Sequence, residues 1–311
     1  MNLKQFDNPK LLFTWDKRSD TDQLKDEYRA FYGLPSEKAF HYNAGYIKVN
    51  NLQIYVQTWQ PAIIKKTIFI VHGYFDHTGL YGHIIRFFLE HSYAVLIFDL
   101  PGHGLSSGER HGIENFSVYS DVLQHCLAHA NNKLPKPWCL FGQSTGAAII
   151  TNSILINHIT SVYNTIDQII LLAPLVKIIH WKYSKIMCRL LSPFVKTVKR
   201  KKSKNLLDPA FATLLKKDPL QYNRVALSWV RALYKWVDEI HQSDNTTSIP
   251  TLIIQGERDK TVDWSYNVAF LSALFCSSEL FLLPQAFHNL VNEPLSVRHK
   301  YYAKLTAWLS P

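Results

Sequence analysis

Residues 138–150 read WCLFGQSTGAAII, an apolar segment that leads through a Gly-x-Ser-x-Gly pentapeptide into a second apolar segment. The first segment predicts a buried strand and the second a helix, which is the setting of a nucleophile elbow. In such a turn the serine takes a strained backbone conformation that lifts its hydroxyl above the sheet. Gly142 and Gly146 supply the small residues that let strand and helix pass closely. The pattern therefore indicates Ser144 as a candidate nucleophile.

Short apolar runs with little alternation recur along the chain on both sides of this stretch. They lie at 67–71, 94–98, 138–141, 166–172, 251–255 and 279–283. Helical patterns separate them at 82–91, 114–131, 145–157, 264–274 and 294–309. Such runs are typical of strands covered on both faces of a parallel sheet. An alternating hairpin around Asn50-Asn51 precedes them, so we expect an α/β fold with a mostly parallel central sheet flanked by helices.

The interval from 177 to 248 interrupts this alternation of strands and helices. Apolar residues recur there at helical spacing opposite Lys182, Lys185 and Arg189, and Ser192-Pro193 predicts the start of a second helix. Further helices are expected at 208–216 and 219–241. The expected organisation is an N-terminal lead-in at 1–44, a core of 45–176 and 249–311, and a helical cap at 177–248, inserted between two late strands.

The formal net charge of +10 is concentrated in one part of this interval. Ten of the 34 Lys and Arg residues lie between Lys177 and Lys204, where there is no Asp or Glu. A basic amphipathic cap predicts peripheral contact with an anionic membrane. A cap helix that packs its apolar face on the core and leaves its lysines solvated would give the same pattern. Nucleic acid is not expected as a partner, because the cluster at 199–204 has no interleaved aromatic residues.

Composition and cysteine usage exclude several classes of protein. Of the 311 residues 47% are hydrophobic, yet no run approaches the roughly 18 apolar residues that a membrane-spanning helix needs. Charged residues scattered through the first twenty positions predict no signal peptide. The four cysteines lack metal-type spacing, so we expect reduced thiols and a cytoplasmic setting. No metal is expected, because His125 and His129 share one helix face without a third ligand or an adjoining Glu. No cofactor is expected, since the glycine-rich stretch 102–108 misses the dinucleotide fingerprint.

A serine nucleophile needs a base within hydrogen-bond reach and an acid that orients the base. Asp259 follows the expected strand 251–255, and His288 follows the strand that ends at Leu283. The order Ser144, Asp259, His288 is that of the α/β hydrolases. Asp263 is the alternative acid, although it lies farther from the strand end.

The oxyanion that forms on the substrate needs preorganised N–H donors. The backbone of Thr145, directly after the nucleophile, is one candidate. The second is expected from the loop after the strand 67–71, where Tyr74 is the first choice and Phe75 the fallback.

Three stretches resemble the monoacylglycerol lipases and bacterial lysophospholipases of the α/β-hydrolase superfamily. They are His72 to His77, Asp99 to Arg110 and the elbow at Ser144. The chain departs from the usual family pattern at Gln143, at Thr145-Gly146-Ala147 and at Asp76. The resemblance implies cofactor-free hydrolysis of single-acyl lipid esters, with Ser144, Asp259 and His288 as triad and Tyr74 and Thr145 as oxyanion donors.

The expected function is thus a serine hydrolase that cleaves esters of monoacyl lipids through an acyl-enzyme on Ser144. An aminopeptidase or thioesterase on the same scaffold is the enzymatic alternative, because fold does not fix the substrate. A lipid- or membrane-binding module that retains the elbow without catalysis is the non-enzymatic alternative.

Overall fold

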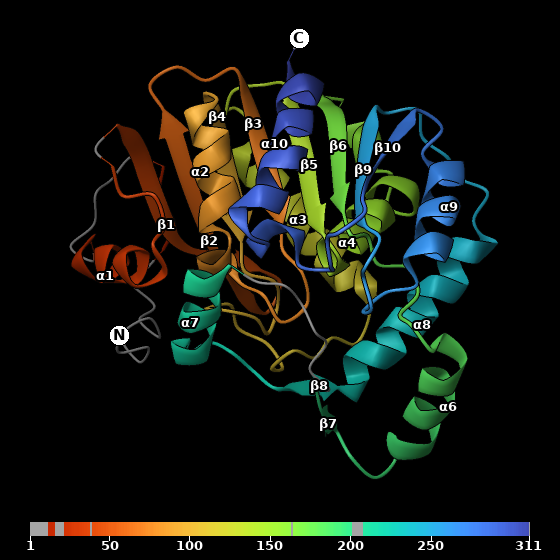
Figure 1. The fold of residues 1–311 in the computed structure, drawn as a ribbon. Coiled ribbons are helices and arrows are strands. Elements are labelled where there is room, and N and C mark those ends of the chain that lie inside the picture. Colours follow the sequence, from red (N-terminus) through yellow and green to blue (C-terminus); the bar gives the residue numbers. More distant parts are fainter. Residues whose placement is uncertain (1–11, 16–21, 38, 163, 201–207, 311) are drawn as a thin grey trace.

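A central eight-stranded sheet organises the computed structural model, which describes residues 12–15, 22–37, 39–162, 164–200 and 208–310 (Figure 1). In spatial order the strands are β1 (Phe40–Val49), β2 (Leu52–Pro61), β4 (Tyr93–Phe98), β3 (Lys66–Val71), β5 (Trp138–Gln143), β6 (Ile166–Leu172), β9 (Thr251–Gly256) and β10 (Ser278–Leu283). The pairs β1–β2 and β2–β4 are antiparallel, and all the others in this sheet are parallel. The prediction of an α/β fold with a mostly parallel sheet is confirmed.

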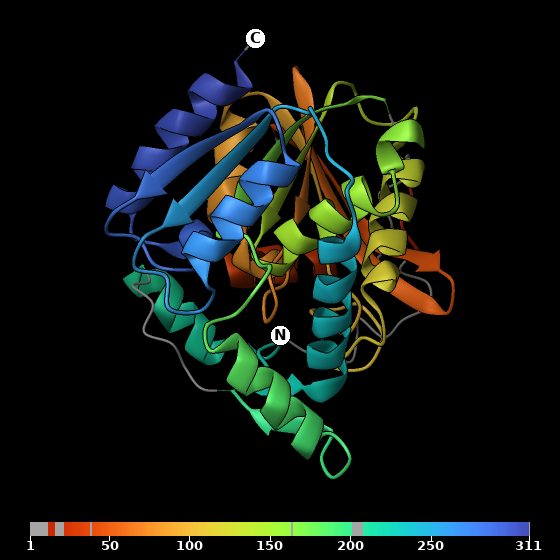
Figure 2. The same ribbon diagram turned by 90° about the vertical axis from the view of Figure 1, so that its right-hand side faces the viewer.

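Helices cover both faces of the sheet (Figure 2). On one face lie α2 (Gly82–Glu90) and α10 (Leu295–Leu309), and on the other α3 (Phe116–Ala130), α4 (Thr145–Leu155) and α9 (Trp264–Leu274). Every residue of β3, β4 and β5 is therefore buried. Burial on both faces explains why these strands lack polar–apolar alternation.

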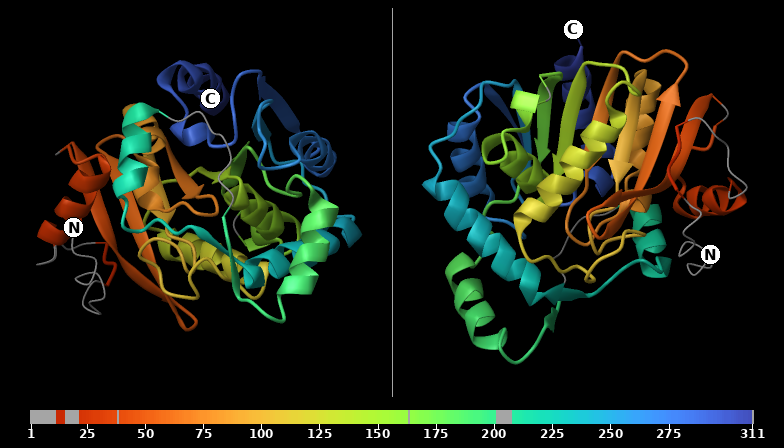
Figure 3. Two further views of the ribbon diagram at one scale, coloured as in Figure 1. Left: turned by 60° about the horizontal axis from the view of Figure 1, so that its bottom comes forward. Right: turned by 180° about the vertical axis from the view of Figure 1, so that it is seen from behind.

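The chain between β6 and β9 extends beyond the carboxyl ends of the parallel strands and returns along its last helix to the start of β9 (Figures 1 and 3). It contains α6 (Trp181–Leu191), β7 (Thr197–Lys199), α7 (Pro209–Lys217), β8 (Arg224–Ala226) and α8 (Leu227–Gln242). Asp208 caps α7 by accepting the N–H groups of Ala210 and Phe211. Lys201, Lys202 and Lys204 of the basic segment lie outside the described residues.

Two helix predictions in this segment are wrong. Ser192-Pro193 does not begin a helix, because the chain turns there and then forms β7, which pairs antiparallel with β8. The helix expected over 219–241 begins only at Leu227, because Arg224–Ala226 is engaged in the same pairing. Strand pairing between distant segments overrides the local helix signals.

The N-terminal part holds a helix that the sequence analysis did not predict, α1 (Asp22–Tyr32). Tyr28 and Tyr32 are buried, and the ring of Tyr28 contacts that of Tyr55 on β2. Shorter helical elements are η2 (Thr78–Leu80), α5 (Ile159–Val162) and η3 (Leu290–Asn292).

Candidate active site

Ser144 lies in a tight turn between β5 and α4. Its backbone has φ 54° and ψ −111°, a strained conformation for a residue with a side chain. A Cβ at Gly146 would lie 1.9 Å from the carbonyl oxygen of Val71, and one at Gly142 would lie 2.6 Å from the nitrogen of Ala147. Glycine at these two positions therefore allows strand and helix the close approach that the turn requires.

The side chains of His288 and Asp259 meet Ser144 at the carboxyl edge of the sheet. His288 Nε2 lies 2.9 Å from Ser144 Oγ, and His288 Nδ1 lies 2.6 Å from Asp259 Oδ2. Asp259 follows β9 and His288 follows β10, strands that run parallel to β5 in the same sheet. The structure thus brings the three residues into one hydrogen-bonded chain from carboxylate to imidazole to hydroxyl.

Asp259 is held by its own turn as well as by His288. Its Oδ1 accepts the backbone N–H groups of Thr261 at 2.8 Å and Val262 at 3.2 Å. Burial opposes ionisation of this carboxyl, but His288 and the two N–H groups more than offset burial and lower its pKa. Asp259 therefore stays ionised at neutral pH and can stabilise an imidazolium. Asp263, the alternative acid, directly precedes α9 instead.

Three contacts that the sequence analysis missed hold the loop that carries His288. Gln143 Nε2 donates to the carbonyl of His288 at 2.9 Å, and Glu293 Oε1 accepts the N–H of Phe287 at 2.7 Å. A Cβ on Gly256 would lie 2.4 Å from the Phe287 carbonyl oxygen, so the end of β9 packs directly on this loop. No motif marked Gln143 or Glu293 for this role, because both side chains act on backbone atoms.

Glu293 is fully buried, and burial, with the nearby charge of Asp259, raises its pKa to about 7. Since this pKa is above the unfolded value, the neutral carboxyl favours the folded state below about pH 4.5, and that stability is lost as the pH rises through 7. We expect Glu293→Gln to remove this pH-dependent loss of unfolding free energy, which amounts to about 3 kcal/mol. Melting curves between about pH 5 and about pH 8 measure it.

The matched control for this prediction is Glu257→Gln, which changes an exposed carboxyl in the turn after β9. Its melting temperature should follow that of the wild type across the same pH range. A Glu293→Gln protein that loses as much stability as the wild type on the alkaline side would contradict the assignment.

The candidate oxyanion donors come from two segments, one before Ser144 in the sequence and one directly after it. Tyr74 and Phe75 are in the loop after β3, and Thr145 is the first residue of α4. Within the described residues, the backbone N–H groups of these three donate to no protein acceptor. The N–H of Thr145 also lies at a helix N-terminus, where the helix dipole favours negative charge.

Asp99 links this loop to the glycine-rich stretch after β4. Its carboxylate accepts the N–H of Thr78 at 2.7 Å and that of Leu105 at 2.8 Å. Gly104 has φ 51°, and a Cβ there would lie 2.0 Å from Asp99 Oδ2. The stretch therefore serves the packing of the two loops.

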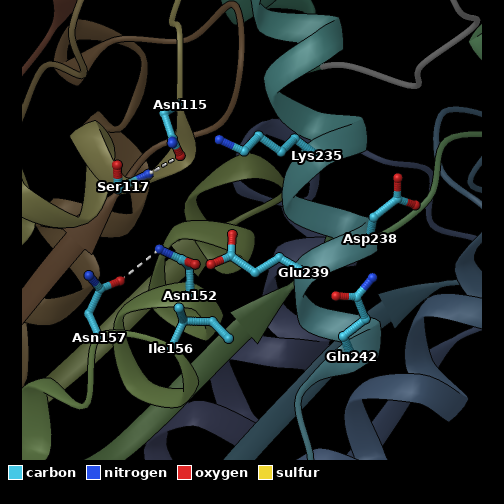
Figure 4. A pocket seen from close by; sticks show the side chains of 9 residues that line it. All are labelled: Asn115, Ser117, Asn152, Ile156, Asn157, Lys235, Asp238, Glu239 and Gln242. Carbon is cyan, nitrogen blue, oxygen red and sulfur yellow. Dashed lines mark hydrogen bonds between the residues drawn. The ribbon is translucent and has the colours of Figure 1, made fainter.

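A polar pocket of about 400 Å³ opens between α3, α4 and α8 (Figure 4). Its lining consists of Asn115, Ser117, Asn152, Ile156, Asn157, Lys235, Asp238, Glu239 and Gln242. No member of the Ser144, Asp259 and His288 group lines it, so we do not assign it to the substrate.

Within the described residues, no three His, Cys, Asp or Glu side chains gather in a way that could hold a metal ion. Cys126, Cys139 and Cys188 are buried, Cys276 is exposed, and all four are free thiols.

The sequence of this chain is similar to that of known proteins. The family described as serine aminopeptidase, S33, matches residues 62–295. The monoglyceride lipase homolog of Monkeypox virus is 25% identical over 269 residues, which cover 84% of this chain and 95% of that protein. The monoglyceride lipase of Homo sapiens is 25% identical over 283 residues, which cover 85% and 89%.

The fold is also similar to solved structures. A soluble variant of the monoglyceride lipase of Saccharomyces cerevisiae matches with a TM-score of 0.75 at 18% identity, over 89% of this chain and 98% of that chain. At this identity the likeness concerns the fold alone, and it confirms the expected α/β-hydrolase fold.

Proposed function

This chain belongs to the serine aminopeptidase, S33, family, and from that premise we propose that it hydrolyses carboxylic esters of monoacyl lipids, either monoacylglycerols or lysophospholipids. The observation that carries the proposal is the hydrogen-bonded chain from Asp259 through His288 to Ser144 Oγ. The lipase names of the similar proteins support the substrate class.

The proposed mechanism uses Ser144 as the nucleophile. His288 Nε2 accepts the hydroxyl proton while Oγ attacks the ester carbonyl, and Asp259 stabilises the resulting imidazolium. The N–H groups of Tyr74 and Thr145 bind the oxyanion. His288 then gives its proton to the departing alcohol, which leaves an acyl group on Ser144. A water molecule, deprotonated by His288, then attacks the acyl carbon. His288 returns this proton to Ser144 Oγ as the acyl–oxygen bond breaks and the fatty acid leaves.

A substrate panel tests the proposal against its rivals. Purified protein is offered a monoacylglycerol, a lysophospholipid, a short p-nitrophenyl ester and an aminoacyl amide, and kcat/KM is measured for each. We expect the largest kcat/KM for one of the two lipid esters. Preference for the amide would instead favour the peptidase reading that the family description suggests, and no turnover of any ester would contradict the proposal.

We further propose that residues 177–248 form a cap over the site, and that α6 in this cap rests on an anionic lipid surface. Apolar side chains on α6 and the turn after it face solvent, namely Tyr183, Ile186, Leu190, Phe194 and Val195. The basic residues Lys182, Lys185 and Arg189 of the same helix are also exposed. Trp181, Cys188 and Leu191 are the ones that pack inward.

The exposure of Tyr183, Ile186 and Leu190 supports this proposal over the alternative, in which the cap helix packs its apolar stripe on the core. Burial of one Leu or Ile side chain contributes about 1.5–3 kcal/mol, and each basic residue near an anionic surface about 1 kcal/mol. Both contributions favour peripheral binding. Within the described ranges, none of the helices combines the length and apolar character that crossing a bilayer requires.

Vesicle sedimentation measures this binding. We expect Ile186→Ser with Leu190→Ser to weaken binding to phosphatidylserine-containing vesicles by roughly 100-fold. The reason is that two apolar side chains that insert into the lipid are lost. Lys182→Gln with Arg189→Gln should weaken binding to these vesicles and lower its salt sensitivity. Leu280→Ser, which changes an exposed leucine on β10, is the matched control and should bind normally. Unchanged binding by both double variants would reject the membrane proposal.

A further inference from the structure

One tyrosine joins the cap to the loop that carries the proposed oxyanion donor. We call residues 73–77 the oxyanion loop. The hydroxyl of Tyr74 accepts the backbone N–H of Ala226 at 3.2 Å and donates to the carbonyl of His111 at 2.8 Å. Ala226 directly precedes α8 in the cap, whereas His111 belongs to the core. The side chain of the residue whose N–H would bind the oxyanion is therefore fixed from both sides.

The ring of Tyr74 is also covered by the cap. It stacks on the indole of Trp229 in the first turn of α8, with ring centroids 4.0 Å apart and planes 20° from parallel. Trp229 is only 6% exposed. A close, nearly parallel stack of the half-buried Tyr74 ring on the buried Trp229 indole fixes both the height and the tilt of the Tyr74 side chain.

The next residue of the loop is held by the cap as well. Phe75 has φ 71°, a left-handed conformation that is strained for a bulky residue and persists only where surrounding contacts enforce it. Two cap side chains supply such contacts. Gln221 Nε2 donates to the Phe75 carbonyl at 3.3 Å, and the Arg200 guanidinium lies 4.0 Å from the centroid of its ring.

A buried hydrogen bond between a histidine and an aspartate ties the end of the same loop to the cap. His77 Nε2 lies 2.9 Å from Asp218 Oδ2, with side chains 1% and 0% exposed. Asp218 also accepts the hydroxyl of Tyr32 on α1 at 2.7 Å. Separating a buried pair of this kind leaves polar groups without partners, so the cap is held against the oxyanion loop in this conformation.

From these contacts we propose that the cap positions the oxyanion donor, with Tyr74 and Trp229 as positioning residues, an inference that rests on the proposed function. The docked cap holds Tyr74 and Phe75 in the conformation that directs the Tyr74 N–H toward the developing charge. Loss of the contact raises the barrier to acylation for every ester. A cap that only binds acyl chains would matter for long substrates and leave a short ester unaffected.

Hydrolysis of p-nitrophenyl acetate separates these two roles, because its acyl group is too short to need a cap. We expect Trp229→Ala to lower kcat for this ester by roughly 10- to 100-fold, with little change in KM. This is less than the roughly 100- to 1000-fold that outright removal of one oxyanion donor costs, because the N–H is misplaced and not removed. Affinity for a methyl trifluoromethyl ketone, which adds to Ser144 as a tetrahedral oxyanion, should fall by the same factor. Tyr74→Phe, which keeps the ring stack, should lower both quantities by a smaller factor.

Tyr234→Phe is the matched control, since it removes a hydroxyl from the same helix, on a ring that packs against Trp181 of α6. It should leave both quantities unchanged. If Trp229→Ala does not fold, as judged by its melting curve, Tyr74→Phe decides in the same two assays. Variants that match the wild type on p-nitrophenyl acetate, or lose activity only on long-chain esters, overturn the inference. Absence of Ser144-dependent turnover by the wild type would instead overturn the proposed function.

Discussion

Replacement of Ser144 by alanine is expected to lower kcat for ester hydrolysis by about 10⁵- to 10⁶-fold. The hydroxyl that His288 Nε2 meets at 2.9 Å is the only group in the proposed mechanism that forms a covalent bond to the acyl carbon. Without it, the site retains oxyanion donors and a base for water, which sustain only slow turnover. Initial rates with a monoacylglycerol and with a p-nitrophenyl ester measure the loss.

Ser153→Ala is the matched control for this variant. Ser153 is also a buried serine, and it lies on α4, the helix that follows Ser144. Its replacement should leave kcat at the wild-type level. Equal rates for the wild type and Ser144→Ala would remove Ser144 from the mechanism, whichever ester is used.

The second large effect is expected for Asp259→Asn, with a loss of about 10⁴-fold in kcat. Asparagine keeps the size of the side chain but not its charge, so it neither stabilises the imidazolium nor selects the tautomer with Nδ1 protonated. Because the contacts of Asp259 hold its pKa below the ordinary value, the carboxylate is ionised in the wild type at neutral pH. The defect should therefore persist across the neutral range, as a pH profile of kcat would measure.

Asp263→Asn serves as the control, because Asp263 is the neighbouring carboxylate that the sequence alone could not exclude. It should keep wild-type kcat, with any effect confined to the start of α9. A large loss in Asp263→Asn together with a small one in Asp259→Asn would reverse the assignment of the acid.

The parts of the fold that the sequence predicts well are those determined by burial. Strands such as those at 94–98 and 138–141 are apolar throughout because helices cover both faces of the sheet. A short run of apolar residues therefore predicts each of them. The elbow is equally local, since Gly142 and Gly146 reflect contacts within a few residues of Ser144 and with the adjacent strand. The α/β-hydrolase fold follows from these two kinds of signal.

The segment around 192–226 could not be predicted in the same way. Ser192-Pro193 locally favours the start of a helix, but the chain that follows pairs as a strand. Thr197–Lys199 pairs with Arg224–Ala226, more than twenty positions away. The spacing of apolar residues on α6 correctly indicates a helix but not its orientation. Trp181 and Cys188 face inward, while Tyr183 and Ile186 face solvent, and only the packing of α6 against the rest of the fold distinguishes these two faces.

The contacts that support the base were likewise beyond the sequence. Gln143 reaches the carbonyl of His288, which lies 145 residues later in the chain. Glu293 accepts the backbone N–H of Phe287. Every residue except proline carries such a group, so no residue type marks it in the sequence. Side chains that bind backbone atoms leave no pairwise pattern, so the structure is needed to find them.

The position of the triad along the chain has a consequence for the order of folding. Ser144 precedes His288 by 144 residues, and the segment 177–248 is inserted between the strands that these two residues follow. If the proposed triad is catalytic, a chain that has already formed the turn at Ser144 during synthesis has no activity until β9 and β10 emerge and join the sheet. Contacts of such long sequence separation form slowly. In refolding, recovery of ester hydrolysis should therefore lag behind recovery of helical circular dichroism, and the delay reports how slowly the last two strands are added.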